Sequence, residues 1–167
     1  LRSMLQWAQD EIVIPNGPHE GDSFRISTQP VMRLLLQEID SKRWNEIYTA
    51  GPSQSGKTLV CFCIPIAYHL AEIGEDLVAG VPDMRMADDK WKEDLLPVFQ
   101  ASPTLRKLLP KEGPGSEGGK ITNAISFANS ATAKWMSRGG SDQSKAGYTA
   151  RVVVVTEAAG FVATETS

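Results

Sequence analysis

Gly51-Pro-Ser-Gln-Ser-Gly-Lys-Thr58 is the stretch that decides the fold of this 167-residue chain. It matches the pattern G-x4-G-K-[ST], which is typical of a loop that binds the phosphates of a nucleotide. A short run with strand character precedes the stretch and a helical pattern follows it, which is the context that the motif requires. We therefore predict a phosphate-binding loop over residues 51–58.

Each residue type in this loop suits the task of holding a polyphosphate. Gly51 and Gly56 let the backbone turn tightly, so that consecutive N–H groups and a helix N-terminus face the anion. Lys57 is predicted to reach the β and γ phosphates, and the hydroxyl of Thr58 to hold Mg²⁺. The remaining residues are expected to line the same site: Pro52, Ser53, Gln54 and Ser55. The simpler alternative is a glycine-rich turn that ends in a solvated lysine.

A second part of the site is expected where the apolar run Val152–Val155 ends in Thr156 and Glu157. Such loops are normally paired with a strand that ends in Asp, which holds Mg²⁺ through water, and often in a following Glu that orients the attacking water. Glu157 fits this catalytic base, although it also fits a solvated acid at a strand end. Thr156 places a neutral hydroxyl where the metal-facing carboxylate is expected, which puts metal affinity and turnover in doubt.

Outward from the loop, strand and helix patterns alternate. Strands are predicted at 46–50, 76–81 and 151–155, the last of them buried on both faces of a sheet. Helices are predicted at 3–13, 30–39, 57–73 and 82–96, the second with Thr28 or Gln29 near its cap and the last two ending at Gly74 and Pro97. Residues 121–128 and 131–136 read as a hairpin. The alternation predicts an α/β fold, with a mostly parallel sheet and helices on both faces.

Composition and charge limit the partners. Apolar residues make up 41% of the chain and charged residues 22%, and no apolar stretch approaches the roughly 20 residues that cross a bilayer. We expect a soluble, intracellular protein with no membrane contact. A net charge of −3 argues against a surface that coats nucleic acid, so any DNA contact should be local or made by a ring of subunits. Cys61 and Cys63 lie two apart in a helical pattern and point in different directions, so we interpret both as small core residues.

Several segments resemble, in order and spacing, the lambda-type (GpA family) large subunit of phage terminase, the ATPase and nuclease that moves DNA into a procapsid. The resemblance covers nearly the whole chain, and its segments are Trp7-Ala-Gln-Asp-Glu11, Arg25-Ile-Ser-Thr-Gln-Pro-Val-Met32, Ser53-Gln-Ser-Gly-Lys-Thr58, Val81-Pro-Asp-Met84, Ser102-Pro-Thr-Leu-Arg106 and Val154-Val-Thr-Glu157. It implies a P-loop NTPase fold of the ASCE type, with ATP and Mg²⁺ as cofactors. It also implies double-stranded DNA as substrate, with the small terminase subunit and the portal protein as partners. The active form would be a homo-oligomeric ring, located in the host cytoplasm.

The resemblance extends to single residues and to domain limits. It implies that Gln29, or the adjacent region before Pro30, contacts adenine, although a capping role fits Gln29 as well. Many terminases carry an Arg where Ser53 stands, and Arg138, Lys145 and Arg151 are the candidates to replace its charge, although each also fits a solvated residue. Residues 1–29 are expected to form an N-terminal helix and lead-in. Residues 30–167 are expected to form the ATPase domain, truncated on its C-terminal side and without the nuclease half.

Three functions remain open at this point. The first is a motor ATPase that couples hydrolysis to DNA movement. The second is a degenerate module that binds ATP as a switch with little hydrolysis, which Thr156 favours. The third is an unrelated P-loop enzyme, such as a small-molecule kinase or a helicase-like protein. The sequence shows no arginine-rich lid for a kinase, and we do not expect a chain of this length to hold the second lobe of a helicase.

Overall fold

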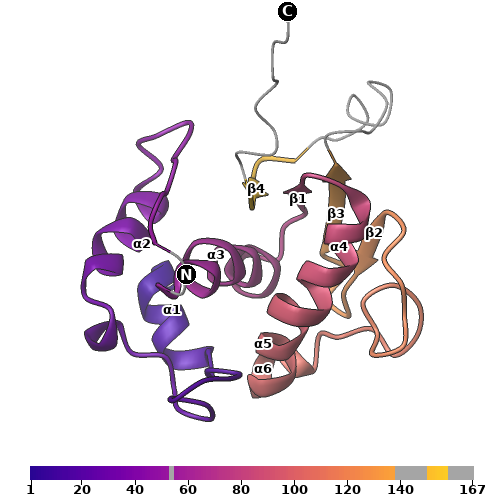
Figure 1. Cartoon of the computed structure of the whole chain (residues 1–167), viewed down its shortest axis with the longest axis horizontal. Coiled ribbons are helices and arrows are strands. Elements are labelled where there is room, and N and C mark those ends of the chain that lie inside the picture. The colour runs from indigo at the N-terminus through magenta and orange to yellow at the C-terminus, as the bar shows by residue number, and fades with distance from the viewer. Residues whose placement is uncertain (53–54, 138–149, 158–167) are drawn as a thin grey trace, which may run out of the picture.

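A computed structural model describes residues 1–52, 55–137 and 150–157 of the chain. Its sheet has the strand order β2-β3-β1-β4 (Figure 1). The strands are β1 (Leu77–Val81), β2 (Ala124–Ser126), β3 (Thr132–Ser137) and β4 (Val153–Val155). β1 pairs in parallel with β3 and with β4, whereas β2 is antiparallel to β3. The α/β architecture, the largely parallel pairing and the hairpin are thus as expected.

β1 and β4 differ sharply in burial. β1 has a neighbouring strand on each side, and all five of its residues are buried. In β4, by contrast, Val153 is 53% exposed and Val155 42% exposed. The prediction that residues 151–155 are buried on both faces was wrong: Val152 and Val154 pack against the core, whereas Val153 and Val155 point to the face that no described helix covers.

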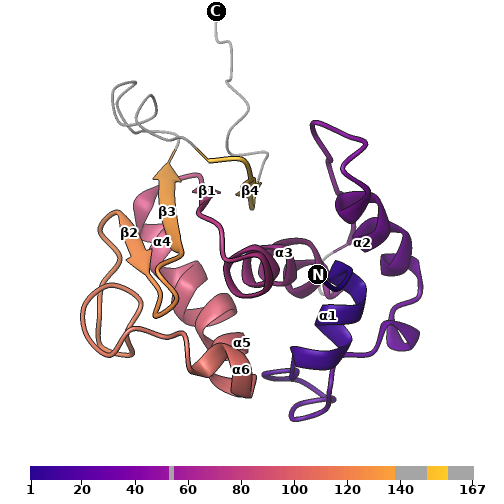
Figure 2. The same cartoon turned by 180° about the vertical axis from the view of Figure 1, so that it is seen from behind.

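The helical segments that follow β1 cover one face of the sheet. They are α4 (Met84–Lys90), the π-helix η4 (Trp91–Leu95) and α5 (Leu96–Ala101), with the short α6 (Pro103–Arg106) after them. Figure 1 shows α4 in front of β3, and Figure 2, from behind, shows β3 in front of α4. Among the described residues no helix covers the opposite face, so the expected cover on both faces is not found there.

The prediction that the helix after β1 ends at Pro97 was wrong. The helix continues to Ala101. Pro97 lies in the first turn of α5, directly after the π-helical turns of η4. A proline is tolerated in the first turn of an α-helical segment because its missing N–H has no partner to lose there. The change from π to α hydrogen bonding therefore lets the chain pass Pro97 without a break.

A long helical run lies between the candidate loop and β1. It consists of η2 (Thr58–Cys63), α3 (Ile64–Tyr68) and η3 (His69–Ile73), and it ends at Gly74, whose φ of 74° is the left-handed conformation typical of a glycine after a helix. The predicted helix 57–73 is confirmed. Cys63 is buried in the core, and this burial raises the pKa of its thiol. Cys61 is only half-buried, so the core interpretation holds for Cys63 alone.

The N-terminal part packs into the same core. It consists of α1 (Met4–Glu11), the 3-10 turn η1 (Ile26–Thr28) and α2 (Val31–Ser41), which confirms the helices predicted at 3–13 and 30–39. Trp7 of α1 stands edge-on to Tyr68, with ring centroids 5.6 Å apart. Neither Thr28 nor Gln29 caps α2, because Pro30 occupies the N-cap position and no side chain donates or accepts there. The division of the chain at residue 29 stays a prediction.

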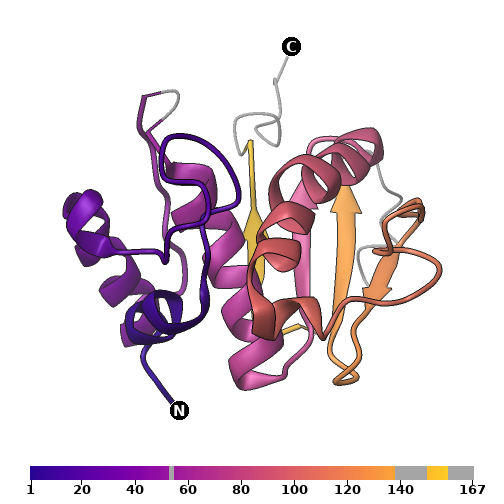
Figure 3. The ribbon, with the colours of Figure 1, turned by 90° about the horizontal axis from the view of Figure 1, so that it is seen from below.

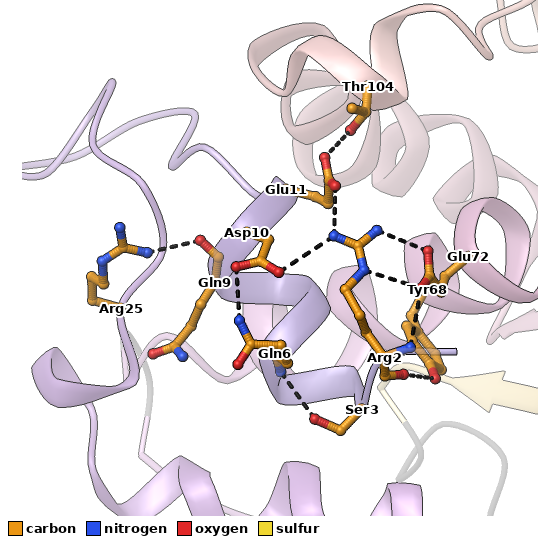
Figure 4. A network of polar contacts seen from close by, with 10 residues as sticks. All are labelled: Arg2, Ser3, Gln6, Gln9, Asp10, Glu11, Arg25, Tyr68, Glu72 and Thr104. Atoms are coloured by element: carbon orange, nitrogen blue, oxygen red, sulfur yellow. Dashed lines mark hydrogen bonds and ion pairs between the residues drawn. The ribbon is translucent and has the colours of Figure 1, made fainter.

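Polar contacts around Arg2 hold the start of the chain in place (Figure 4). Its guanidinium lies 2.7 Å from a carboxylate oxygen of Glu11 and 3.4 Å from one of Asp10. Thr104 of α6 donates a hydrogen bond of 2.8 Å to Glu11, and the Tyr68 hydroxyl donates one of 2.7 Å to the carbonyl oxygen of Arg2. The network thus joins α1 to the helical run and to α6.

The strand predicted at 46–50 was wrong. These residues are exposed, and no described strand pairs with them. Ile47 and Trp44 instead line a shallow groove together with Val31 and Leu34 of α2. Strand propensity depends on a partner strand and on burial, and this segment has neither in the described structure.

Candidate nucleotide-binding site

The helical run begins at Thr58, on the side of the sheet at which the carboxyl ends of β1 and β4 lie. After Ile73 the chain turns back into β1, so β1 runs opposite to the helical run, and β4 is parallel to β1. Figure 3 shows the run beside β4, with its start on the side to which the arrows of β3 and β4 point. The carboxyl ends of parallel strands are where open α/β sheets bind their ligands.

The loop before the start of the helical run has a left-handed glycine, a lysine that bonds to the loop itself, and a buried serine hydroxyl. Gly56 adopts a φ of 75°, which glycine reaches without steric penalty. The ammonium of Lys57 donates a hydrogen bond to the carbonyl oxygen of Gly51, so this side chain folds back over the loop. The hydroxyl oxygen of Ser55 is buried and has no hydrogen-bond partner among the described residues. Of the other predicted loop residues, Pro52 is exposed, and Ser53 and Gln54 lie outside the described residues.

Gln29 lies against this loop. Its amide Nε2 donates a hydrogen bond of 3.2 Å to the carbonyl oxygen of Ser55. A Cβ atom on residue 56 would lie only 2.1 Å from the same Nε2, so the Gln29 amide occupies the space that a side chain at Gly56 would need. The residue that was expected near adenine therefore contacts the backbone of the loop.

Thr156 and Glu157 lie at the carboxyl end of β4. The backbone N–H of Thr156 donates to the carbonyl oxygen of Gly80 at 3.1 Å, which extends the pairing of β4 with β1 by one residue. Glu157 has a φ of 55°, and its carboxylate lies 3.7 Å from the ammonium of Lys90 on α4. Lys90 also pairs with Asp94 at 3.2 Å. Lys90 thus links the end of β4 to α4.

Of the other expected cations, only Arg151 lies among the described residues. Arg151 is highly exposed, pairs with Glu75 at 3.7 Å, and precedes β4, so it lies at the opposite end of that strand from Glu157. Arg138 and Lys145 lie outside the described residues. Within the described ranges no group of three or more His, Cys, Asp and Glu side chains could hold a metal ion.

A comparison with protein families identifies the chain. The model of the ATPase domain of phage terminase large subunit gpA matches residues 19–167. The chain belongs to this family. Searches of the curated proteins and of the solved structures found no match. The terminase ATPase domain is a component of phage DNA packaging, and the resemblance that the sequence showed is confirmed. No helix in the part of this terminase domain that the structure describes is long and apolar enough to cross a membrane.

Two contacts of the terminase domain escaped sequence analysis. One is the hydrogen bond from Gln29 to Ser55, and the other is the ion pair between Lys90 and Glu157. The helical pattern of residues 82–96 placed Lys90 on a helix but did not indicate which strand end it would meet. Gln29 was selected only by resemblance, and no local pattern pointed it at the loop.

Proposed function

We propose that this terminase domain binds ATP with Mg²⁺ at residues 51–58 and hydrolyses it. The observation that carries the proposal is the start of the buried helical run, directly after the loop, on the side of the sheet at which β4 ends (Figure 3). A helix N-terminus presents unpaired N–H groups and a partial positive charge, which favour a phosphate anion. Membership of an ATPase-domain family supports the same conclusion.

The described loop residues fit a triphosphate. A buried hydroxyl without a hydrogen-bond partner requires an explanation, and a phosphate oxygen would provide the partner that Ser55 lacks. Lys57 is bonded to a neutral carbonyl oxygen of its own loop. A charged phosphate oxygen is a stronger acceptor for an ammonium, so Lys57 would exchange Gly51 for the nucleotide.

The remaining roles follow from the sheet edge. ATP and Mg²⁺, when bound, would supply the bond that is cleaved and the cation that offsets its charge. Thr58 would hold the metal through its hydroxyl, with Thr156 facing it from the end of β4. Mg²⁺ commonly takes only one or two protein ligands and fills its other positions with water and phosphate oxygens. Glu157 would orient the attacking water and take up its proton.

At the level of the whole machine, we propose that hydrolysis moves double-stranded DNA into a procapsid. The portal protein and the small terminase subunit would be partners, and several copies of the chain would form a ring in the host cytoplasm. A chain with net charge −3 has little capacity to neutralise a DNA backbone over its whole surface. In a ring, each copy would need only a local contact with the DNA.

The second candidate function is a switch that binds ATP but hydrolyses it slowly. Two observations favour it: Thr156 is uncharged, and the carboxylate of Glu157 is paired with Lys90 on α4. The two candidates share the binding step and differ only in turnover. Phosphate release by the unaltered chain in the presence of Mg²⁺ therefore distinguishes them.

Calorimetry with a non-hydrolysable ATP analogue tests the binding step. Lys57→Ala should abolish measurable binding and leave the unfolding temperature unchanged, because the side chain serves the loop and not the core. Lys111→Ala, at an exposed position far along the chain, is the matched control and should bind as the unaltered chain does. Equal affinity in the Lys57→Ala variant and the control would overturn the assignment of the loop.

A further inference from the structure

We propose that Gln29 is a positioning residue that orients the phosphate-binding loop, and that it acts on the triphosphate and not on the base of the nucleotide. The proposal rests on the proposed function of residues 51–58. Its starting point is the hydrogen bond of 3.2 Å from Nε2 of Gln29 to the carbonyl oxygen of Ser55. This contact uses the amide to hold backbone of the loop.

The orientation of one peptide group explains how a side chain behind the loop acts on its ligand. In a trans peptide the C=O and the following N–H point in opposite directions. The bond from Gln29 draws the carbonyl oxygen of Ser55 towards itself, so the N–H of Gly56 points to the side of the loop away from Gln29. An N–H group fixed in this direction is available to an anion before the anion arrives, which reduces the free energy spent on ordering.

Packing restrains the same peptide group a second time. A Cβ atom on residue 56 would lie 2.1 Å from Nε2 and 2.9 Å from Cδ of Gln29. The amide of Gln29 therefore fits against the bare backbone of Gly56, whose φ of 75° also favours glycine. The hydrogen bond and the close packing together resist a flip of this peptide group.

Gln29 is itself fixed on both sides by its backbone. Its N–H donates to the carbonyl oxygen of Ile26 at 3.0 Å, and its own carbonyl oxygen accepts from the N–H of Met32 at 3.0 Å. Ile26 is buried in the core, and Met32 packs against it. The support for the loop is therefore the connection between η1 and α2, which these two backbone hydrogen bonds hold.

Two substitutions separate the hydrogen bond from the packing. Gln29→Met keeps nearly the same length and volume but has no donor, and Gln29→Glu keeps the shape while replacing the donor with an acceptor. Gln37→Ala, at an exposed glutamine of α2, serves as the control. Each variant is measured by calorimetry with three ligands, each with Mg²⁺: a non-hydrolysable ATP analogue, the matching GTP analogue, and inorganic tripolyphosphate.

Gln29→Met should weaken all three ligands by the same factor, about fivefold for the loss of one neutral hydrogen bond. Gln29→Glu should weaken all three further, because its carboxylate would repel the carbonyl oxygen of Ser55 and the triphosphate. The unfolding temperature without ligand should match that of the control, which separates loop positioning from a general loss of structure. A loss confined to the ATP analogue would overturn the proposal in favour of a base contact, and unchanged affinity in Gln29→Met would overturn it in favour of packing alone. Failure of the unaltered chain to bind any of the three would instead reject the proposed function itself.

Discussion

The carboxylate of Glu72 accepts two side-chain hydrogen bonds from the guanidinium of Arg2, 3.1 Å from Nε and 2.9 Å from Nη2 (Figure 4). It also accepts the backbone N–H of Arg2 at 3.2 Å. Paired bonds of this kind are among the stronger charge-assisted contacts, because the two parallel bonds fix the planar guanidinium and the planar carboxylate relative to each other. Glu72 belongs to η3, so the contact attaches the first residues of the chain to the end of the helical run.

Glu72→Gln should lower the free energy of unfolding by about 1 kcal/mol, because it removes the charge and one acceptor from a partly buried pair. Urea denaturation followed by tryptophan fluorescence measures the difference. Glu20→Gln, at an exposed position, is the control and should leave the free energy of unfolding unchanged. Equal values for the two variants would show that the pair contributes nothing to stability.

The same pair should make stability depend on pH. The hydrogen bonds from Arg2 hold the pKa of Glu72 below its ordinary value. A carboxyl whose pKa is lower in the folded chain contributes its stability above the unfolded pKa, and that contribution is lost as the pH falls through the folded pKa. The difference in free energy between the unaltered chain and Glu72→Gln should be complete at about pH 7 and shrink steadily below about pH 4.5. A constant difference across this range would contradict the cause given for the pKa.

Asp83 should be a strong N-cap of α4. Its carboxylate oxygen Oδ1 accepts the backbone N–H groups of Arg85 at 2.8 Å and Met86 at 3.2 Å. Asp83→Ala should therefore destabilise the fold by about 1 kcal/mol, whereas Asp83→Ser, which retains a capping oxygen, should recover most of that loss. Thermal unfolding of the two variants beside the unaltered chain measures both values, and an equal loss in both would exclude capping as the cause.

Thr156→Asp should tighten the binding of Mg²⁺·ATP several-fold and raise hydrolysis. A carboxylate at this position would make a charge-assisted hydrogen bond to the hydrated metal, which contributes about 1 kcal/mol more than a neutral hydroxyl does. Binding of an ATP analogue and release of phosphate, both measured over a titration of Mg²⁺, check the two effects. If neither quantity changes, Thr156 does not face the metal.

Glu157→Gln should lower hydrolysis by about 100-fold while leaving ATP affinity nearly unchanged, because it removes a general base and no phosphate contact. Glu93→Gln, at an exposed position of η4, is the matched control. Phosphate release and calorimetry on the same preparations separate turnover from binding. Full activity in Glu157→Gln would assign the base to another residue.

Local sequence signals predicted the parts of the fold that local chemistry decides. The helix that ends at Gly74 followed from periodicity and a glycine stop, and β1 followed from a short apolar run bounded by polar residues. The errors arose where the structure of a segment depends on the elements that pack beside it. Segment 46–50 has strand-forming residues but no partner strand among the described residues. β4 has an apolar sequence, but no described helix covers one of its faces. Pro97 follows π-helical turns that no sequence pattern predicted.

The residues of the candidate site also fall into those that local sequence predicted and those that it did not. Lys57 and Thr58 could be selected from a motif because their proposed task is met within one loop and one helix turn. Glu157 could be selected because a carboxylate at a strand end is visible in the sequence. The bond from Gln29 to Ser55 spans 26 residues, and Lys90 meets Glu157 from a different element. Only the packing of α2, the loop and α4 around the helical run brings these pairs together.

Glu157 has a left-handed backbone conformation, with a φ of 55°. At this position the residue that would be most stable differs from the residue that the proposed chemistry needs. A residue with a Cβ atom pays roughly 1–2 kcal/mol for this conformation, whereas glycine adopts it freely. Glu157→Gly should thus be selected in a screen for thermostable variants, and the same variants would lack the carboxylate at the sheet edge. With Glu157 in its proposed role as the base, directed evolution of this domain for heat resistance alone would therefore select variants without turnover, unless each round also selected for hydrolysis.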